Sequence, residues 1–194
     1  MSNNVVDWSE VCLVGIGSHA RRRLIPALQS LANRPVTSIV SRQKLDLNFS
    51  CLQFSDLKQA LARASPSTLF IVANPPACHF SSALMILNAG FDVMIEKPGF
   101  LTSHELDQLI SVALSKKLLL IEMFMYLENN ISHSVFEFIK SYRKDIKRID
   151  FNFTLPTLPS NTFRNYTTFE GSLLLDMGCY PLNFLLNAGL TIDD

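Results

Sequence analysis

A short polar segment, Glu96-Lys97-Pro98, follows the apolar run at residues 91–95. The run indicates a short buried strand, and a charged lysine at its end is poor core material because burying a charge is costly. In open α/β sheets, ligands bind outside the carboxyl ends of the strands. We therefore expect Lys97 to face a cofactor and a substrate bound at that edge of a sheet.

A glycine-rich turn follows the apolar run at 11–14 and precedes a helical pattern from 21 to about 32. The turn consists of Gly15, Ile16, Gly17, Ser18, His19 and Ala20. The first glycine allows a tight turn, the second lets the backbone approach a pyrophosphate, and the small Ala20 lets the helix pack closely on the strand. A pyrophosphate would lie at the helix N-terminus, where free N–H groups favour an anion. An ordinary strand-to-helix turn with two glycines stays open as the alternative.

The end of the second apolar run, at 36–40, indicates which dinucleotide such a turn would bind. Sites for NAD usually place an acidic residue there to hold the ribose hydroxyls. Ser41 and Arg42 stand there instead. A serine can bond a phosphate oxygen, and a guanidinium can pair with a phosphate or stack on adenine. The pair favours NADP over NAD, and a solvated surface arginine is the alternative reading of Arg42.

The elements that position these residues alternate along the chain. Apolar runs at 11–14, 36–40, 68–73, 91–95 and 118–123 are separated by helical patterns at 21–32, 55–61, 77–89 and 102–117. Strands and helices that alternate in this way predict a doubly wound parallel sheet, the Rossmann type of α/β fold. Residues 1–127 are predicted to form this domain.

The pattern changes in residues 128–194, which are predicted to form an incomplete second domain of α+β type with an open sheet. A helix is expected at 130–142, then a strand from Arg148 to Thr154, a proline-bearing loop at 155–168, and a second helix at 170–181. That second helix carries Asp176 and Tyr180 four residues apart, so both lie on one face.

Composition excludes several classes of protein. The 194 residues contain 17 Lys and Arg against 17 Asp and Glu, so no basic excess indicates nucleic acid, and no segment indicates a membrane. The four cysteines lack the spacing of metal ligands, so no metal site is expected. A polar N-terminus without a signal region, and apolar runs too short to span a bilayer, predict a cytoplasmic protein, in whose reducing environment the cysteines should be free thiols.

Three motifs in one order resemble the Gfo/Idh/MocA family of NAD(P)-dependent oxidoreductases. They are Gly15-x-Gly17-x-x-Ala20, Glu96-Lys97-Pro98 and Asp176-x-Gly178-x-Tyr180. The resemblance implies a Rossmann domain that binds NAD or NADP, followed by an open-sheet domain; the preference for NADP comes from Ser41 and Arg42. It implies hydride transfer between nicotinamide and a carbon of a sugar, a nucleotide sugar or a cyclic polyol or ketone. Lys97 and Tyr180 would lie beside the reacting oxygen, with Asp176 on the same helix face.

The resemblance also implies cofactor contacts from the ends of the middle strands. These contacts would come from Ala73, Asn74, Pro75, His79, Glu96 and Lys97. For His79 the sequence favours capping or packing of the following helix over a place near the nicotinamide ribose. For Lys97 an ion pair with Glu96 or Asp176 is the structural alternative, and for Tyr180 it is a buried hydroxyl with a partner.

The proposed chemistry also makes sense without the resemblance. Oxidation of an alcohol by hydride loss also removes its hydroxyl proton, and ketone reduction adds one. Tyrosine, with an ordinary pKa near 10, is a poor base at neutral pH, but a nearby ammonium lowers that pKa. Lys97 would favour the phenolate and stabilise charge on the substrate oxygen.

The chain stops shortly after the third motif, whereas family members are longer. A partial sheet would expose an apolar face and unpaired edges, so a homo-oligomer is expected. The alternative to an enzyme is a non-catalytic nucleotide-binding regulator or a degenerate, truncated member of the family.

Overall fold

A computed structural model describes residues 8–31, 36–154 and 173–190. The chain divides into two compact units, Met1–Met123 and Phe124–Asp194. The predicted domains 1–127 and 128–194 stay predictions.

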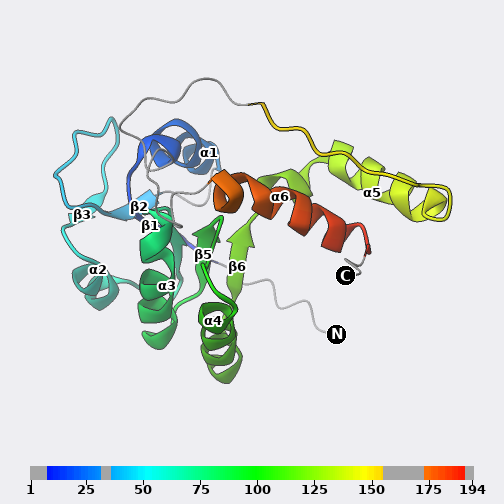
Figure 1. Ribbon diagram of the computed structural model, residues 1–194. Coiled ribbons are helices and arrows are strands. Elements are labelled where there is room, and N and C mark those ends of the chain that lie inside the picture. Colours follow the sequence, from blue (N-terminus) through cyan, green and yellow to red (C-terminus); the bar gives the residue numbers. More distant parts are fainter. Residues whose placement is uncertain (1–7, 32–35, 155–172, 191–194) are drawn as a thin grey trace. The chain divides into compact units, whose positions relative to one another are not determined.

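The first unit contains a six-stranded sheet in the order β3-β2-β1-β4-β5-β6 (Figure 1). Every neighbouring pair of strands is parallel. The strands are β1 (Glu10–Val14), β2 (Val36–Val40), β3 (Leu52–Phe54), β4 (Thr68–Val72), β5 (Val93–Glu96) and β6 (Leu120–Met123). The helical elements are η1 (Ala20–Leu24), α1 (Ile25–Ser30), α2 (Leu57–Arg63), η2 (Pro76–Cys78), α3 (His79–Asn88) and α4 (Ser103–Lys116). The predicted doubly wound parallel sheet is confirmed.

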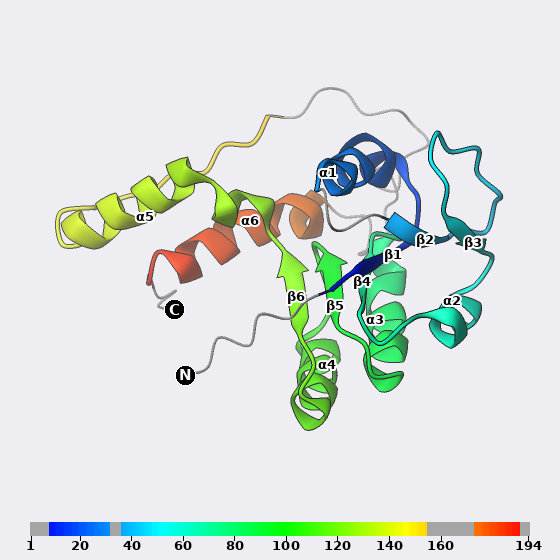
Figure 2. The ribbon, with the colours of Figure 1, turned by 180° about the vertical axis from the view of Figure 1, so that it is seen from behind.

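Both faces of the sheet are buried, which explains why its strands are continuous apolar runs. Successive side chains of β1 point to opposite faces: Cys12 and Val14 join one core cluster, and Val11 and Leu13 join the other. The helices α2, α3 and α4 cover the first face, where Ile86 of α3 is fully buried. The elements η1 and α1 cover the other face. Helices α3 and α4 lie side by side in both ribbon views (Figure 2).

Local signals set the helix ends, with two differences from the sequence prediction. Helix α2 begins after Asp56, whose carboxylate accepts the Gln59 N–H, so the helix starts two residues later than the predicted pattern at 55–61. The single helix expected from 21 to 32 is a π-helical turn, η1, followed by the short α1. The helix predicted from 102 is confirmed, and Thr102 caps α4 because its hydroxyl accepts the Glu105 N–H.

In the described residues of the second unit, all regular elements are helical: η3 (Met125–Glu128), α5 (Asn130–Tyr142) and α6 (Leu173–Asn187). The helix predicted at 130–142 is confirmed. The strand predicted from Arg148 to Thr154 is wrong, because these residues form no strand and pair with none in the part of the chain that the structure describes. The predicted loop at 155–168 lies outside the described residues. No helix in the described part of the chain is long and apolar enough to cross a membrane.

Asp92 ties together three segments at the amino ends of the strands. Its Oδ2 accepts the indole N–H of Trp8 at 2.8 Å, and its Oδ1 accepts the backbone N–H of Leu119 at 2.8 Å. One carboxylate therefore joins the segment before β1, the start of β5 and the segment before β6.

Replacement of Asp92 by alanine should destabilise the first unit by about 1–3 kcal/mol, because it leaves two donors without their acceptor. Asp92→Asn should cost less, since the amide oxygen still accepts one of the two bonds. Urea unfolding followed by the fluorescence of Trp8, the single tryptophan, measures both variants. Asp107→Ala on the exposed side of α4 is the control, and equal midpoints for Asp92→Ala and this control would contradict the assignment.

Candidate functional site

The glycine-rich turn is pressed against the residue that follows β4. Gly15 has a φ of +89°, and a Cβ placed on it would lie 2.5 Å from the backbone N and Cα of Asn74. Backbone bonds hold both segments there: Gly15 N–H donates to Val40 O at 3.0 Å, and Ala73 N–H donates to Val14 O at 2.7 Å. Position 15 therefore requires glycine for both conformation and space.

Gly17, unlike Gly15, has room for a side chain, because no heavy atom lies within 4 Å of a Cβ placed on it. The space beside the turn is open, as a site for an approaching ligand must be. Ala20 is fully buried in the cluster under η1, which is the close packing expected of a small residue there. The following π-helical turn, η1, is of a kind that concentrates at functional sites.

Asn74 carries a buried polar atom that its surroundings leave unsatisfied. Its Nδ2 donates to Ser82 Oγ at 2.9 Å, but its Oδ1 is buried without a hydrogen-bond partner among the described residues. Such an acceptor is costly unless a donor arrives, and a ligand hydroxyl would supply one. The open space at Gly17 and the acceptor of Asn74 together fit a dinucleotide cofactor.

Ser41 and Arg42 follow β2, as the sequence analysis expected. Ser41 is fixed by its backbone N–H, which donates to Phe54 O at 3.0 Å, and its hydroxyl accepts the Gln43 N–H at 3.3 Å. Arg42 is exposed. Their binding of a phosphate stays a prediction.

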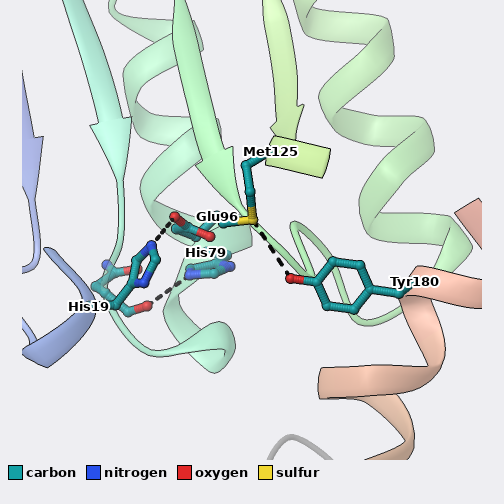
Figure 3. A network of polar contacts seen from close by, with 6 residues as sticks. His19, His79, Glu96, Met125 and Tyr180 are labelled. Carbon is teal, nitrogen blue, oxygen red and sulfur yellow. Dashed lines mark hydrogen bonds and ion pairs between the residues drawn. The ribbon is translucent and has the colours of Figure 1, made fainter. Parts of the chain in front are cut away.

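Glu96 is the last residue of β5 and contacts the glycine-rich turn. Its Oε1 lies 2.8 Å from His19 Nε2 (Figure 3). Glu96 is buried, whereas the His19 side chain is 45% exposed. An ionised carboxylate only accepts, so the Nε2 hydrogen of His19 makes this bond. Both residues are predicted from the sequence at the cofactor site, but their pairing is not.

Lys97 follows Glu96 and is half-buried at the start of the turn that leaves β5. The next two residues are buried and are held by groups from other elements. Gly99 N–H donates to Glu122 Oε1 of β6 at 2.8 Å, and Pro98 O lies 2.8 Å from His79 Nδ1. Burial raises the pKa of Glu122, and the bond from Gly99 partly opposes that shift. The role of Glu122 in holding this turn was not predicted from the sequence.

His79 is the first residue of α3 and is only 1% exposed. Its second ring nitrogen, Nε2, lies 2.7 Å from Asn74 O. Both ring nitrogens therefore contact backbone carbonyls, which favours a packing role over direct contact with a cofactor. Burial lowers the pKa of His79, and the contacts with Pro98 and Asn74 oppose that shift.

Asp176 and Tyr180 lie one turn apart on α6, with Asp176 buried. Tyr180 belongs to an aromatic cluster of the second unit with Phe124, Tyr126 and Phe153, at centroid distances of 5.8–6.1 Å. The Tyr180 hydroxyl lies 3.9 Å from the sulfur of Met125 (Figure 3).

Tyr126 is a second tyrosine of this cluster, and the sequence analysis gave it no role. Its hydroxyl donates to Asn183 Oδ1 at 2.6 Å, and burial raises its pKa to about 12. This shift moves Tyr126 further from proton exchange at neutral pH.

The structure brings together the predicted cofactor residues of the first unit: the glycine-rich turn, Asn74, His79 and Glu96. Lys97 lies in that unit, whereas Asp176 and Tyr180 lie in the second. The meeting of Lys97 with Tyr180 stays a prediction.

Comparison with known proteins identifies relatives that match most of this chain in sequence. Two curated proteins, from Saccharopolyspora spinosa and Actinomadura kijaniata, are named dTDP-3,4-didehydro-2,6-dideoxy-alpha-D-glucose 3-reductase. They are 27% and 28% identical over 87% and 89% of this chain, which covers 52% and 53% of their own lengths. The chain thus spans about half the length of the curated relatives it matches.

A solved structure of KijD10, a 3-ketoreductase from Actinomadura kijaniata in complex with NADP and TDP-benzene, is also similar. It superposes with a TM-score of 0.76 at 26% identity, over 91% of this chain and 56% of that one.

The sequence model of an oxidoreductase family with an NAD-binding Rossmann fold matches residues 9–124. This range holds the six-stranded sheet, the glycine-rich turn and the Glu96-Lys97-Pro98 segment. The chain therefore belongs to the Gfo/Idh/MocA family of oxidoreductases.

Proposed function

We propose that this chain is an NADP-preferring oxidoreductase that transfers a hydride between nicotinamide and a ring carbon of a nucleotide-linked sugar. The observation that carries the proposal is the glycine-rich turn pressed onto Asn74, with open space at Gly17 and the turn of Lys97 at the same edge of the sheet. The names of the curated relatives support a deoxysugar ketone as the substrate.

In this proposal the bound dinucleotide supplies or accepts the hydride. The Lys97 ammonium stabilises negative charge on the sugar oxygen, because a fixed cation acts where charge develops. The Tyr180 hydroxyl gives its proton to that oxygen when a ketone is reduced, and its phenolate takes the proton back when an alcohol is oxidised. Asp176, one helical turn away on α6, supports Tyr180 in this role.

Selectivity for NADP rests on Ser41 and Arg42. A guanidinium and a hydroxyl at the end of β2 suit the 2′-phosphate, and no acidic residue stands at either position. A protein that binds the nucleotide without turnover is the second candidate function, because the predicted cofactor residues lie in the first unit and Tyr180 lies in the second.

Gly17→Val should lower the affinity for NADPH about tenfold or more, because the valine side chain fills the space left for the pyrophosphate. Its thermal midpoint should stay near that of the unchanged protein, as no atom lies within 4 Å of the new Cβ. Gly15→Ala should instead lose stability, since its Cβ meets the Asn74 backbone. NADPH fluorescence titration and thermal melts separate the two effects. An unchanged protein that binds neither NADPH nor NADH would refute the proposed function.

Arg42→Ala should weaken NADPH binding about tenfold and leave NADH binding within about twofold, because only NADPH carries the 2′-phosphate. The same titration measures both cofactors. Arg63→Ala, at the last turn of α2, controls for the loss of one positive charge. Equal weakening of both cofactors would remove the argument for NADP.

Lys97→Ala should lower the rate of reduction of a dTDP-linked ketodeoxysugar at least about a hundredfold, because it removes the cation that stabilises the oxygen. NADPH affinity should stay nearly the same. Loss of NADPH absorbance measures turnover, and Lys116→Ala at the end of α4 is the control. Full activity of Lys97→Ala would disprove its role, whereas binding without turnover in the unchanged chain supports the second candidate.

A further inference from the structure

The turn that carries Lys97 is fixed on two sides by side chains of other elements. On one side His79 of α3 contacts Pro98 O at 2.8 Å, and on the other Glu122 of β6 accepts the Gly99 N–H at 2.8 Å. A shift of the two residues after Lys97 would therefore break a contact to the buried His79 or to the half-buried Glu122.

His79 also reaches a second segment of the proposed cofactor site. Its other ring nitrogen lies 2.7 Å from Asn74 O, so one imidazole joins the residue after β4 to the turn after β5. Asn74 is the residue whose Oδ1 is buried without a partner among the described residues. The position of that acceptor and the position of Lys97 thus depend on the same ring.

The chemistry of these contacts makes His79 difficult to replace. Both partners are carbonyl oxygens, which only accept hydrogen bonds. The ring must therefore supply an N–H to each contact that it satisfies: one as neutral imidazole, and both as imidazolium. Burial lowers the pKa of His79 and favours the neutral ring, and the contacts with Pro98 and Asn74 and the carboxylate of Glu96 only partly oppose that shift. A side chain without N–H groups would leave both carbonyls unsatisfied in a dry environment.

We propose that His79 is a positioning residue for the nicotinamide end of the cofactor site, which it builds by holding the Asn74 segment and the Lys97 turn together. It touches neither substrate nor cofactor and acts through Asn74 and Lys97. This inference rests on the proposed function, because it needs a dinucleotide whose nicotinamide lies at those two segments.

The consequence is a selective loss of affinity. Contacts at the adenine end come from other residues, the glycine-rich turn with Ser41 and Arg42, which His79 does not contact in any described bond. Removal of the His79 ring should therefore weaken NADPH but spare 2′-phosphoadenosine 5′-diphosphoribose, which is NADP without its nicotinamide. A defect that only loosened the fold would weaken both molecules alike.

Calorimetric titration of the full chain with NADPH and with this fragment tests the proposal. His79→Leu, which lacks donors, should weaken NADPH about tenfold, as expected for the loss of one or two neutral hydrogen bonds. Fragment affinity should stay within about twofold. His79→Gln should rescue part of the loss, since its amide carries two N–H groups. His104→Leu, the same change at an exposed histidine of α4, should alter neither affinity.

Each outcome decides between distinct alternatives. If His79→Leu does not fold, His79→Gln still tests the inference by an NADPH-specific loss of about threefold. Unchanged NADPH affinity in folded His79 variants, or equal losses for NADPH and the fragment, would overturn the positioning role while leaving the proposed function intact. Failure of the unchanged chain to bind NADPH overturns the proposed function, and the inference with it.

Discussion

The contact between the turn after β1 and the residue after β4 exists only because position 15 has no side chain. With a Cβ at 2.5 Å from the Asn74 backbone, the two segments could not both hold their backbone bonds. Their closeness places Asn74 beside the glycine-rich turn. His79 then links Asn74 to the turn after β5, and Glu96 links that turn back to His19. The ends of three strands are thereby joined in one closed set of contacts.

The sheet could be predicted from sequence because burial on both faces demands continuous apolar runs. Where that demand is weak, prediction failed. Strand β3 was missed, since it has three residues and Leu52 is 57% exposed at the edge of the sheet. The strand predicted from 148 to 154 was inferred from alternating character. In the structure Phe151 packs on Phe184 and Phe153 lies near Tyr180, so these aromatic rings contact α6 and no strand among the described residues pairs with the segment.

The candidate site shows a different limit of sequence reasoning. Residue types at the ends of predicted strands located the glycine-rich turn, Asn74 and the Glu96-Lys97-Pro98 segment. The bonds among these segments were not predictable, because they join residues 77, 23 and 19 positions apart. A histidine or glutamate has the same appearance in sequence whether it faces solvent or holds a turn. Only the fold shows that His19 pairs with Glu96, and that His79 and Glu122 take opposite sides of one turn.

The aromatic cluster of the second unit constrains the proposed proton transfer. Burial raises the pKa of Tyr126 to about 12, and aromatic surroundings offer a phenolate no compensating positive charge. Tyr180 lies against the same rings, so a role in proton exchange requires a cation close to its hydroxyl. In the proposed function that cation is Lys97, which belongs to the other unit of the chain. The proposed catalysis would therefore need residues of both units, whereas the proposed cofactor contacts all come from the first unit.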